Sequence, residues 1–343
     1  MSSVVHRSRV ENMVRRSWKG TPSPLLRAIS AVYGMVADVR NAAWTVGFAK
    51  PVRAPVPIIS VGGLMIGGSG KTPITVALAR HLADSGSRVA VLTAGLADET
   101  AVHGTRNPDI PVLSGRDKGQ LANLAAQQGA TVALVDSGFQ HRRLERDLEI
   151  VAISADYSGN QFRLPAGPFR DRWAELRRAD AVIVVRRHAP VEAVAHLATA
   201  LSHSFPGIHI ANAWIVPASL SPVSEAAHDV DMPSPDLAVT GVMWPEAVFV
   251  AVTQLGLAPE HCLALPDHAI LDQQTVARIV DLAGSGGVVC TGKDVVKLVA
   301  ALPVSVPVWQ IVDHLEWGQG GDELLRAVTH VAGMGTDRRA AAR

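Results

Sequence analysis

The sequence predicts an α/β fold with two domains, each a parallel sheet covered by helices, and a separate helix before the first domain. Short apolar segments alternate with segments of helical periodicity from Val56 to Val331. The apolar segments are hydrophobic at consecutive positions, as strands buried on both faces of a parallel sheet are. At 343 residues, with 48% hydrophobic and 18% charged residues, the chain is long enough for two cores and is not an extended disordered protein.

The expected order is an N-terminal basic segment with an amphipathic helix (1–50), a first domain (51–216), a Pro- and Ser-rich linker (217–235), a second, smaller domain (236–335) and a tail (336–343). Strands expected in the first domain are Val56–Val61, Val89–Leu92, Pro111–Leu113, Thr131–Asp136, Leu148–Ile153 and Ala181–Val185. Helices expected there are Pro73–Asp84, Lys118–Gln128 and Val191–Ser204. The second domain is expected to alternate in the same way: Leu237–Val242, Glu246–Leu255, Val288–Cys290, Val295–Ala301, Val306–Val312 and Glu323–Val331.

Charge and cysteine content exclude several classes of protein. Lys and Arg number 32 against 31 for Asp and Glu, so the overall charge gives no indication of nucleic-acid binding. The two cysteines, Cys262 and Cys290, are far apart and form no disulfide or zinc pattern, which favours a reducing cytoplasm. No secretory signal is evident, and no uninterrupted apolar stretch reaches the roughly 18 to 20 residues needed to span a bilayer. We therefore expect any membrane contact to be at the surface, and no feature predicts a protein partner.

The segment from Leu25 to Phe48 has helical periodicity and follows a start that holds five basic residues and one acid in 19 positions. At about 100° per residue, one narrow face carries Leu25, Ile29, Val32, Val36, Val39 and Ala43. The opposite face carries Arg27, Ser30, Gly34, Asp38 and Asn41. Two interpretations remain open. The helix docks on its own domain, or it lies in a membrane interface with help from the basic residues and from Trp18 and Trp44.

The strongest local motif follows the first predicted strand and precedes a predicted helix. It consists of Gly67, Gly68, Ser69, Gly70, Lys71 and Thr72. Glycines allow backbone N–H groups to turn toward phosphate oxygens, and the following helix N-terminus adds a positive dipole end. Lys71 supplies a charge for the β- and γ-phosphates, and the hydroxyl of Thr72 suits Mg²⁺. The alternative is a glycine-rich turn with an incidental lysine. The strict P-loop motif is not met, because Met65 stands where that motif has glycine. We predict a P-loop NTPase-type domain that binds ATP and Mg²⁺.

A second candidate for the metal site is Asp136. The apolar strand Thr131–Asp136 ends in this carboxylate, as does the strand by which P-loop proteins hold Mg²⁺. Apolar strands that end in Asp are common, but its separation from the phosphate loop, with strands and helices between, favours a metal-binding role for Asp136.

Several stretches resemble the lipid A 4'-kinase (tetraacyldisaccharide 4'-kinase) family. Residues 136–141 are similar to its D-D-G-F-Q-H, and Val61-Gly62 with Gly67–Pro73 are similar to its V-G-N and G-G-T-G-K-T-P. Gly159-Asn160 and Leu164–Asp171 resemble its G-N and L-P-A-G-P-L-R-E. Pro266-Asp267-His268 and Thr291–Leu298 resemble its P-D-H-H and T-E-K-D-A-V-K-L. The resemblance extends over about residues 25 to 300.

The resemblance implies transfer of the γ-phosphate of ATP to the 4'-hydroxyl of a tetraacyldisaccharide 1-phosphate, at the cytoplasmic face of the bacterial inner membrane. It implies that Asp98 takes the proton of the sugar hydroxyl, assisted by His268. Arg116 and Arg170 are candidate phosphate clamps in substrate binding, and Asn160 of the G-N motif is a further candidate substrate residue. Taken alone, each has a plainer interpretation. Asp98 could be a solvated loop acid, His268 a packed or capping histidine, and the arginines ordinary surface residues.

The sequence departs from the family pattern near the chemistry. Ser137 replaces the second acid of D-D-G-F-Q-H, and Ala94 replaces an arginine after the second strand. Gly63, Ala269 and Gly292 replace an asparagine, a histidine and a glutamate. Two alternatives to an active kinase follow. One is a catalytically impaired, lipid-binding paralogue. The other is a membrane-recruited P-loop ATPase switch, which would hydrolyse ATP without an acceptor.

Overall fold

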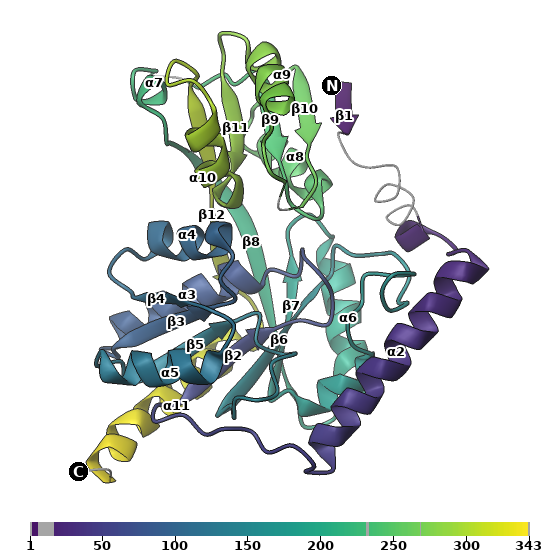
Figure 1. Cartoon of the computed structure of the whole chain (residues 1–343), viewed down its shortest axis with the longest axis vertical. Coiled ribbons are helices and arrows are strands. Elements are labelled where there is room, and N and C mark those ends of the chain that lie inside the picture. Colours follow the sequence, from purple (N-terminus) through teal and green to yellow (C-terminus); the bar gives the residue numbers. More distant parts are fainter. Residues whose placement is uncertain (1, 6–16, 231–232, 268, 342–343) are drawn as a thin grey trace. The chain divides into compact units, whose positions relative to one another are not determined.

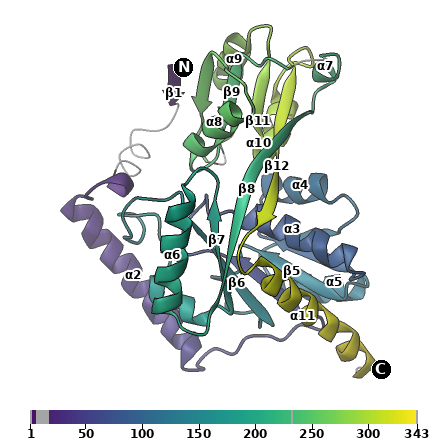
Figure 2. The ribbon, with the colours of Figure 1, turned by 180° about the vertical axis from the view of Figure 1, so that it is seen from behind.

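The protein is described by a computed structural model covering residues 2–5, 17–230, 233–267 and 269–341. The chain divides into a larger unit (residues 13–214 and 315–343) and a smaller unit (residues 1–12 and 215–314). Figure 1 shows the ribbon with its elements labelled, and Figure 2 shows the reverse side. Four of the basic residues of the N-terminal segment, Arg7, Arg9, Arg15 and Arg16, lie outside the described residues.

The larger unit contains a parallel sheet with the strand order β8-β7-β6-β2-β5-β3-β4. The strands are β2 (Ile58–Gly62), β3 (Val89–Thr93), β4 (Val112–Ser114), β5 (Val132–Asp136), β6 (Leu148–Ser154), β7 (Ala181–Arg186) and β8 (His209–Pro222), of which β8 ends in the smaller unit. Every residue of β2, β3, β5 and β6 is buried. This burial explains why these strands are apolar at consecutive positions, and it confirms the predicted fold class of a parallel sheet covered by helices.

Helices cover this sheet and connect its strands. They are α3 (Lys71–Asp84), α4 (Ala97–Arg106), α5 (Lys118–Gln127), α6 (Val191–Ser204) and α11 (Gly321–Ala341), with a 3-10 helix at Trp173–Arg178. Ala122 and Ala125 of α5 share a buried cluster with Ile58, Leu92 and Val135 of the strands. Because parallel strands end at one edge of a sheet, the loops after β2, β3 and β5 are all at the same edge.

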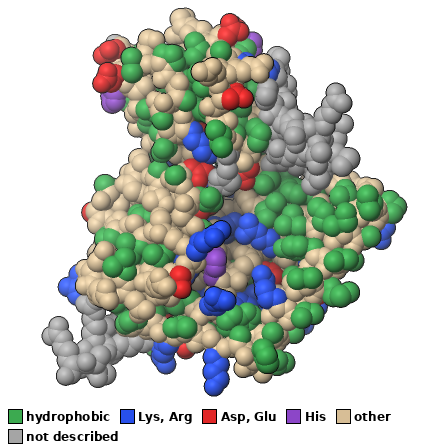
Figure 3. All heavy atoms as spheres, in the orientation of Figure 1, with side chains coloured by type: hydrophobic (Ala, Val, Ile, Leu, Met, Phe, Trp, Pro, Cys, Tyr) green, Lys and Arg blue, Asp and Glu red, His purple; other side chains and the backbone are tan. Residues whose placement is uncertain are grey.

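Helix α2 (Pro24–Thr45) has its polar side buried and its apolar side exposed. It begins with Ser23 as N-cap, whose hydroxyl accepts a hydrogen bond from the N–H of Leu26, and Pro24 in the first turn. Its buried residues are Ser30, Gly34, Ala37 and Asn41. Its exposed apolar residues, which we call the outer face, are Leu25, Ile29, Val32, Met35, Val36 and Val39. Hydrophobic side chains gather along this face in Figure 3. The helix therefore docks on its own domain, as one of the two interpretations had it, but through its polar side, and the apolar face is left exposed.

Small and polar residues dock α2 on the loop that precedes the 3-10 helix. A side chain at Gly34 would collide with the guanidinium of Arg163, which donates to the Gly34 carbonyl (3.0 Å) and to Asp38 (2.8 Å). The Ser30 hydroxyl donates to the Arg163 carbonyl, and the Asn41 amide donates to the buried carboxylate of Asp171 at 3.0 Å. These directed bonds fix which side of the helix faces the protein.

The smaller unit contains a parallel sheet with the order β1-β10-β9-β11-β12. Its strands are β1 (Ser2–Val5), β9 (Leu237–Thr240), β10 (His261–Ala264), β11 (Val288–Thr291) and β12 (Val308–Trp317), of which β12 ends in the larger unit. Its helices are α7 (Glu225–His228), α8 (Pro245–Gln254), α9 (Gln273–Ala283) and α10 (Gly292–Ala301). Leu237, Val239 and Leu263 pack with Ile279 and Leu298 in its core.

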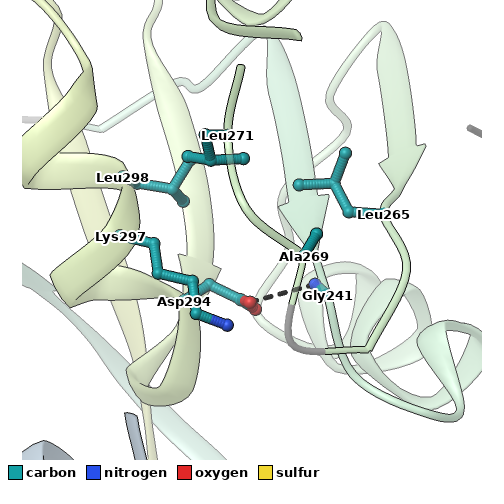
Figure 4. A pocket seen from close by; sticks show the side chains of 7 residues that line it. All are labelled: Gly241, Leu265, Ala269, Leu271, Asp294, Lys297 and Leu298. Atoms are coloured by element: carbon teal, nitrogen blue, oxygen red, sulfur yellow. Dashed lines mark hydrogen bonds between the residues drawn. The ribbon is translucent and has the colours of Figure 1, made fainter. Parts of the chain in front are cut away.

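The carboxylate of Asp294 joins three segments of the smaller unit. It accepts hydrogen bonds from the hydroxyls of Thr240 (3.0 Å) and Thr291 (2.7 Å) and from the N–H of Gly241 (3.0 Å). Figure 4 shows it beside a cavity of about 10 Å³, which is room for one water and not for a substrate. Burial raises the pKa of Asp294 in spite of these bonds. Within Thr291–Leu298, Asp294 therefore has a structural role that joins these segments.

The units differ from the expected domains at three places. Residues 217–235, expected to be a linker, include the end of β8 and helix α7, because proline fits the extended backbone of a strand. Residues 315–335 belong to the larger unit, where α11 buries Leu324 and Val328 and Thr329 hydrogen bonds His81 of α3. The expected tail is helical as far as Ala341.

Replacing Asp294 with alanine should lower the free energy of unfolding of the smaller unit by about 3 kcal/mol, because three buried donors lose their acceptor. Asp294→Asn should cost about 1 kcal/mol or less, since the threonine hydroxyls can turn to accept from the new amide.

The raised pKa of Asp294 means that the folded state holds the carboxyl proton more tightly than the unfolded chain does. Unfolding free energy should therefore fall as the pH rises above about 4 in the native protein, and should lose this dependence in Asp294→Asn. Hydrogen exchange of the amides of β9 and β11 at pH 5 and 8 measures the free energy of unfolding in each variant and its dependence on pH. An equal loss of unfolding free energy in Asp294→Ala and Asp294→Asn would contradict the role of Asp294 as a hydrogen-bond acceptor.

Candidate functional site

The loop after β2 has the backbone of a phosphate-binding turn. Gly67, Gly68 and Gly70 have φ angles of 62°, 70° and 79°, a region that glycine enters without strain. Gly70 is the N-cap of α3, and the first turn of this helix contains no acidic residue. The N–H groups of the first turn and the positive end of the helix dipole therefore favour an anion at this loop.

Lys71 and Thr72 begin α3 and bring a cation and a hydroxyl to the same loop. The ammonium of Lys71 donates to the hydroxyl of Ser69 at 3.2 Å, and the Ser69 side chain is buried within the turn. A Cβ at Gly63, which precedes the turn, would lie 2.9 Å from the Ser69 hydroxyl, so the buried Ser69 side chain would have to shift. This glycine thus keeps the space behind the turn free for the Ser69 side chain.

Asp136 lies at the end of β5, paired with Val61 of β2 immediately before the phosphate loop. Its buried carboxylate accepts hydrogen bonds from Nε2 of His103 at 2.9 Å and from the Ser137 hydroxyl at 3.2 Å. Burial alone would raise the pKa of Asp136. The bond and charge of His103, the charge of Lys71 and the hydroxyl of Thr72 outweigh burial and hold the pKa below its usual value. The predicted metal-binding pair, Thr72 and Asp136, is therefore together at one place.

Helix α4 carries Asp98 in its first turn, where the sequence was expected to form a loop. Asp98 is 5% exposed and accepts a hydrogen bond from the N–H of Glu99 at 3.0 Å. It is thus a buried acid at a helix N-terminus and not a solvated loop acid. The helix is held to α3 by the amide of Asn107, which donates to the Val76 carbonyl, and to β5 by His103.

Lys118 is a buried cation beside these acids. Its ammonium donates to the carbonyls of Thr93 and Gly115, at the ends of β3 and β4. Burial lowers the pKa of Lys118 to about 8, although the charges of Asp136 and Glu99 oppose the shift. The acids and Lys118 thus form a partly neutralised cluster at the edge of the sheet where β3 and β5 end.

The loop that holds α2 also pairs with the start of the phosphate loop. The N–H of Arg170 donates to the Leu64 carbonyl at 2.7 Å, and Met65 bridges Phe169. The side chain of Arg170 is exposed, and its charge contributes to a lowered pKa of His141, for which burial is the largest cause. Gln140 donates to both the Gly63 carbonyl and the Asp171 carboxylate at 2.9 Å. The predicted phosphate contact, Arg170, is therefore held next to the phosphate loop.

Among the described residues, no hydrogen bond or ion pair joins the other two predicted substrate residues, Asn160 and Arg116, to the phosphate loop. The amide of Asn160 donates to the carbonyls of Ser17, Gly20 and Ala166, so its side chain anchors the chain before α2, and contact with a substrate gains no support. Arg116 is exposed in the loop between β4 and α5. His268 lies outside the described residues.

Three residues near the phosphate loop were not singled out from the sequence. His103 and Lys118 contact the acids, and the guanidinium of Arg187 donates to the Gly68 carbonyl at 3.3 Å. Only recognition of α4 could have indicated His103, which lies one turn after Glu99 on the same helix face. Nothing in the local pattern distinguishes Lys118 and Arg187 from surface cations.

The central strand leads through a glycine turn into a helix that starts with Lys71, and a neighbouring strand ends in Asp136. This arrangement defines a P-loop protein that binds nucleoside triphosphates. The family model described as tetraacyldisaccharide-1-P 4'-kinase matches residues 22–104 and 94–330, and the chain belongs to this family.

Known proteins agree with this membership. The tetraacyldisaccharide 4'-kinase of Herminiimonas arsenicoxydans is 30% identical over 327 residues, covering 87% of this chain and 89% of that protein. That of Anaeromyxobacter sp. (strain K) is 32% identical over 351 residues, covering 90% of each. The crystal structure of LpxK from Aquifex aeolicus in complex with ATP has a TM-score of 0.67 at 23% identity, covering 89% of this chain and 98% of that one, and shares the fold. The family predicted from the motifs is confirmed.

The lowered pKa of Lys118 predicts a pH-dependent stability. Between about pH 8 and 10.5 the unfolded chain binds a proton that the folded state has lost, so stability rises with pH in this window. The free energy of unfolding should increase relative to Lys118→Met by up to ~1.4 kcal/mol per pH unit. Urea unfolding at pH 7.5, 8.5 and 9.5 measures it, with the exposed Lys50→Met as control. Parallel profiles for the native protein and Lys118→Met would contradict the lowered pKa.

Proposed function

We propose that the protein transfers the γ-phosphate of ATP to the 4'-hydroxyl of a tetraacyldisaccharide 1-phosphate, forming lipid IVA. The oxygen of the sugar hydroxyl bonds to the γ-phosphorus, the bond to the bridging oxygen breaks, and ADP leaves. The observation that carries the proposal is the assembly of a glycine turn, Lys71, Thr72 and Asp136 at one edge of the sheet, in a chain of this family.

The residues at this edge fit a magnesium ion. Thr72 and Asp136 offer a hydroxyl and a carboxylate, and Mg²⁺ prefers oxygen ligands and is usually held by one or two carboxylates together with substrate phosphates. Among the described residues no group of three or more His, Cys, Asp or Glu could hold a metal, which suits a site completed by phosphate oxygens. Bound there, the ion would neutralise charge on the β- and γ-phosphates.

Asp98 is the candidate acceptor of the hydroxyl proton. Phosphoryl transfer requires positioning and charge neutralisation more than covalent chemistry, so one well-held carboxylate is enough for this role. Helix α4 supplies it from a buried position, and the hydrogen bonds of Asn107 and His103 fix this helix against α3 and β5. Lys71 would hold the β- and γ-phosphates, and Arg170, whose backbone is bonded to Leu64 before the loop, would be a further cation for a phosphate.

Replacing Lys71 with alanine should lower kcat/KM for phosphate transfer to the disaccharide lipid at least 100-fold, or about 2.7 kcal/mol, because the phosphates lose their nearest cation. Asp98→Asn should lower kcat with little change in the KM for ATP, because the amide cannot accept the hydroxyl proton. Transfer of labelled phosphate in detergent micelles measures the kinetic constants of both variants, with Arg88→Ala, at the opposite end of β3, as control. Transfer no greater in the native protein than in Lys71→Ala would favour an impaired lipid-binding paralogue, and hydrolysis without acceptor would favour an ATPase switch.

We further propose that α2 holds the protein on the cytoplasmic face of the bacterial inner membrane, where ATP is available. No helix among the described residues is long and apolar enough to cross a membrane. The outer face of α2 exposes Val32, Met35 and Val36 at 62–65%, and Phe48, just beyond the helix, at 90%. Burying each such side chain contributes roughly 1.5–3 kcal/mol. A four-chain lipid acceptor would be reached without leaving the bilayer.

Two charges on the outer face should abolish membrane binding. Val32→Glu combined with Val36→Glu should reduce sedimentation with vesicles of anionic phospholipid at least 10-fold, since both carboxylates would have to enter the interface. The matched control, Leu124→Glu with Val191→Glu, adds the same charges to exposed positions on α5 and α6 and should bind as the native protein does. Equal binding by both double variants would exclude α2 as the contact.

A further inference from the structure

The strongest unassigned feature of the larger unit is the buried pair of His103 and Asp136. Their side chains are 1% and 0% exposed, and Nε2 of His103 lies 2.9 Å from Oδ2 of Asp136. An ionised carboxylate only accepts hydrogen bonds, and this one also accepts from the Ser137 hydroxyl, so we place the proton of this bond on Nε2. Nδ1 is buried, and no group in the described parts of the chain bonds it. The ring is therefore directed by a single hydrogen bond, and that bond is made to Asp136.

This bond restricts the carboxylate. Oδ2 is occupied by a ring N–H that packing holds in place, whereas the other hydrogen-bond partners of the carboxylate are hydroxyls, that of Ser137 on Oδ1 and that of Thr72, which can rotate. The carboxylate thus has one fixed oxygen and one oxygen available to a ligand. A partner that orients a ligating group in this way typically contributes 10–100-fold to metal affinity.

We propose that His103 is a positioning residue for the metal site, holding Oδ2 of Asp136 so that the other carboxylate oxygen would be available to the Mg²⁺ that accompanies ATP. Its position on α4 extends the effect. Asp98 is five residues earlier on the same ten-residue helix, so the bond that orients the metal ligand also holds the proton acceptor against β5. The inference rests on the proposed Mg²⁺–ATP site and does not require the lipid acceptor.

The test compares His103→Leu, which removes the donor, with His103→Gln, whose amide nitrogen reaches about as far as Nε2 and can donate the same bond. Mg²⁺ is titrated against the full-length protein with a fluorescent, non-hydrolysable ATP analogue, and nucleotide affinity is measured separately in EDTA. His103→Leu should raise the Mg²⁺ midpoint ~10–100-fold with nucleotide affinity in EDTA unchanged, and His103→Gln should restore the midpoint to within about 3-fold.

Two results would overturn the inference. One is an unchanged Mg²⁺ midpoint in His103→Leu. The other is an equal loss of nucleotide affinity with and without Mg²⁺, which a purely structural role would cause. If His103→Leu does not fold, His103→Asn, whose shorter amide does not reach Asp136, replaces it, and equal midpoints for the Asn and Gln variants would count against the proposal. The titration contains no lipid, so its outcome is separate from that of the transfer assay.

Discussion

The burial of one carboxylate organises the candidate site. Asp136 ends β5 where water does not reach it, and a buried charge persists only if neighbouring groups compensate it. His103 compensates it from α4, Lys71 from the phosphate loop and Lys118 from the start of α5. His103, Lys71 and Lys118 are on α4, α3 and α5, so the requirement of a single side chain fixes three helices around the end of one strand.

Asp171 has a similar role on the other side of the phosphate loop. Its carboxylate accepts from Asn41 of α2 and from Gln140, which also bonds the carbonyl of Gly63. The exposed apolar helix and the strand leading into the phosphate loop are thereby connected through one buried acid. Asn160, whose similarity to a family motif suggested contact with a substrate, helps to hold this frame through its bonds to the carbonyls of Ser17 and Gly20.

The sheet of the larger unit was predictable from sequence because its strands are buried on both faces and read as continuous apolar segments. The phosphate loop was predictable because each residue type has a physical role there. Glycines allow the backbone N–H groups to turn toward a phosphate, lysine supplies a positive charge, and threonine supplies a hydroxyl at the start of the helix. Helix α4 was missed because its ten residues include Gly104, Asp98 and two threonines, and it is stabilised by tertiary contacts such as that of His103. The orientation of α2 could not be decided from periodicity, which identifies an apolar face and does not say what that face touches.

The inverted polarity of α2 also affects how the protein behaves in water. A newly made molecule in water presents a continuous strip of aliphatic side chains that its own core does not cover, and such strips associate with one another. In the cell, a strip of this kind is a surface that chaperones recognise. In the test tube it favours clustering of molecules through their helices, which detergent above its micelle concentration would reverse.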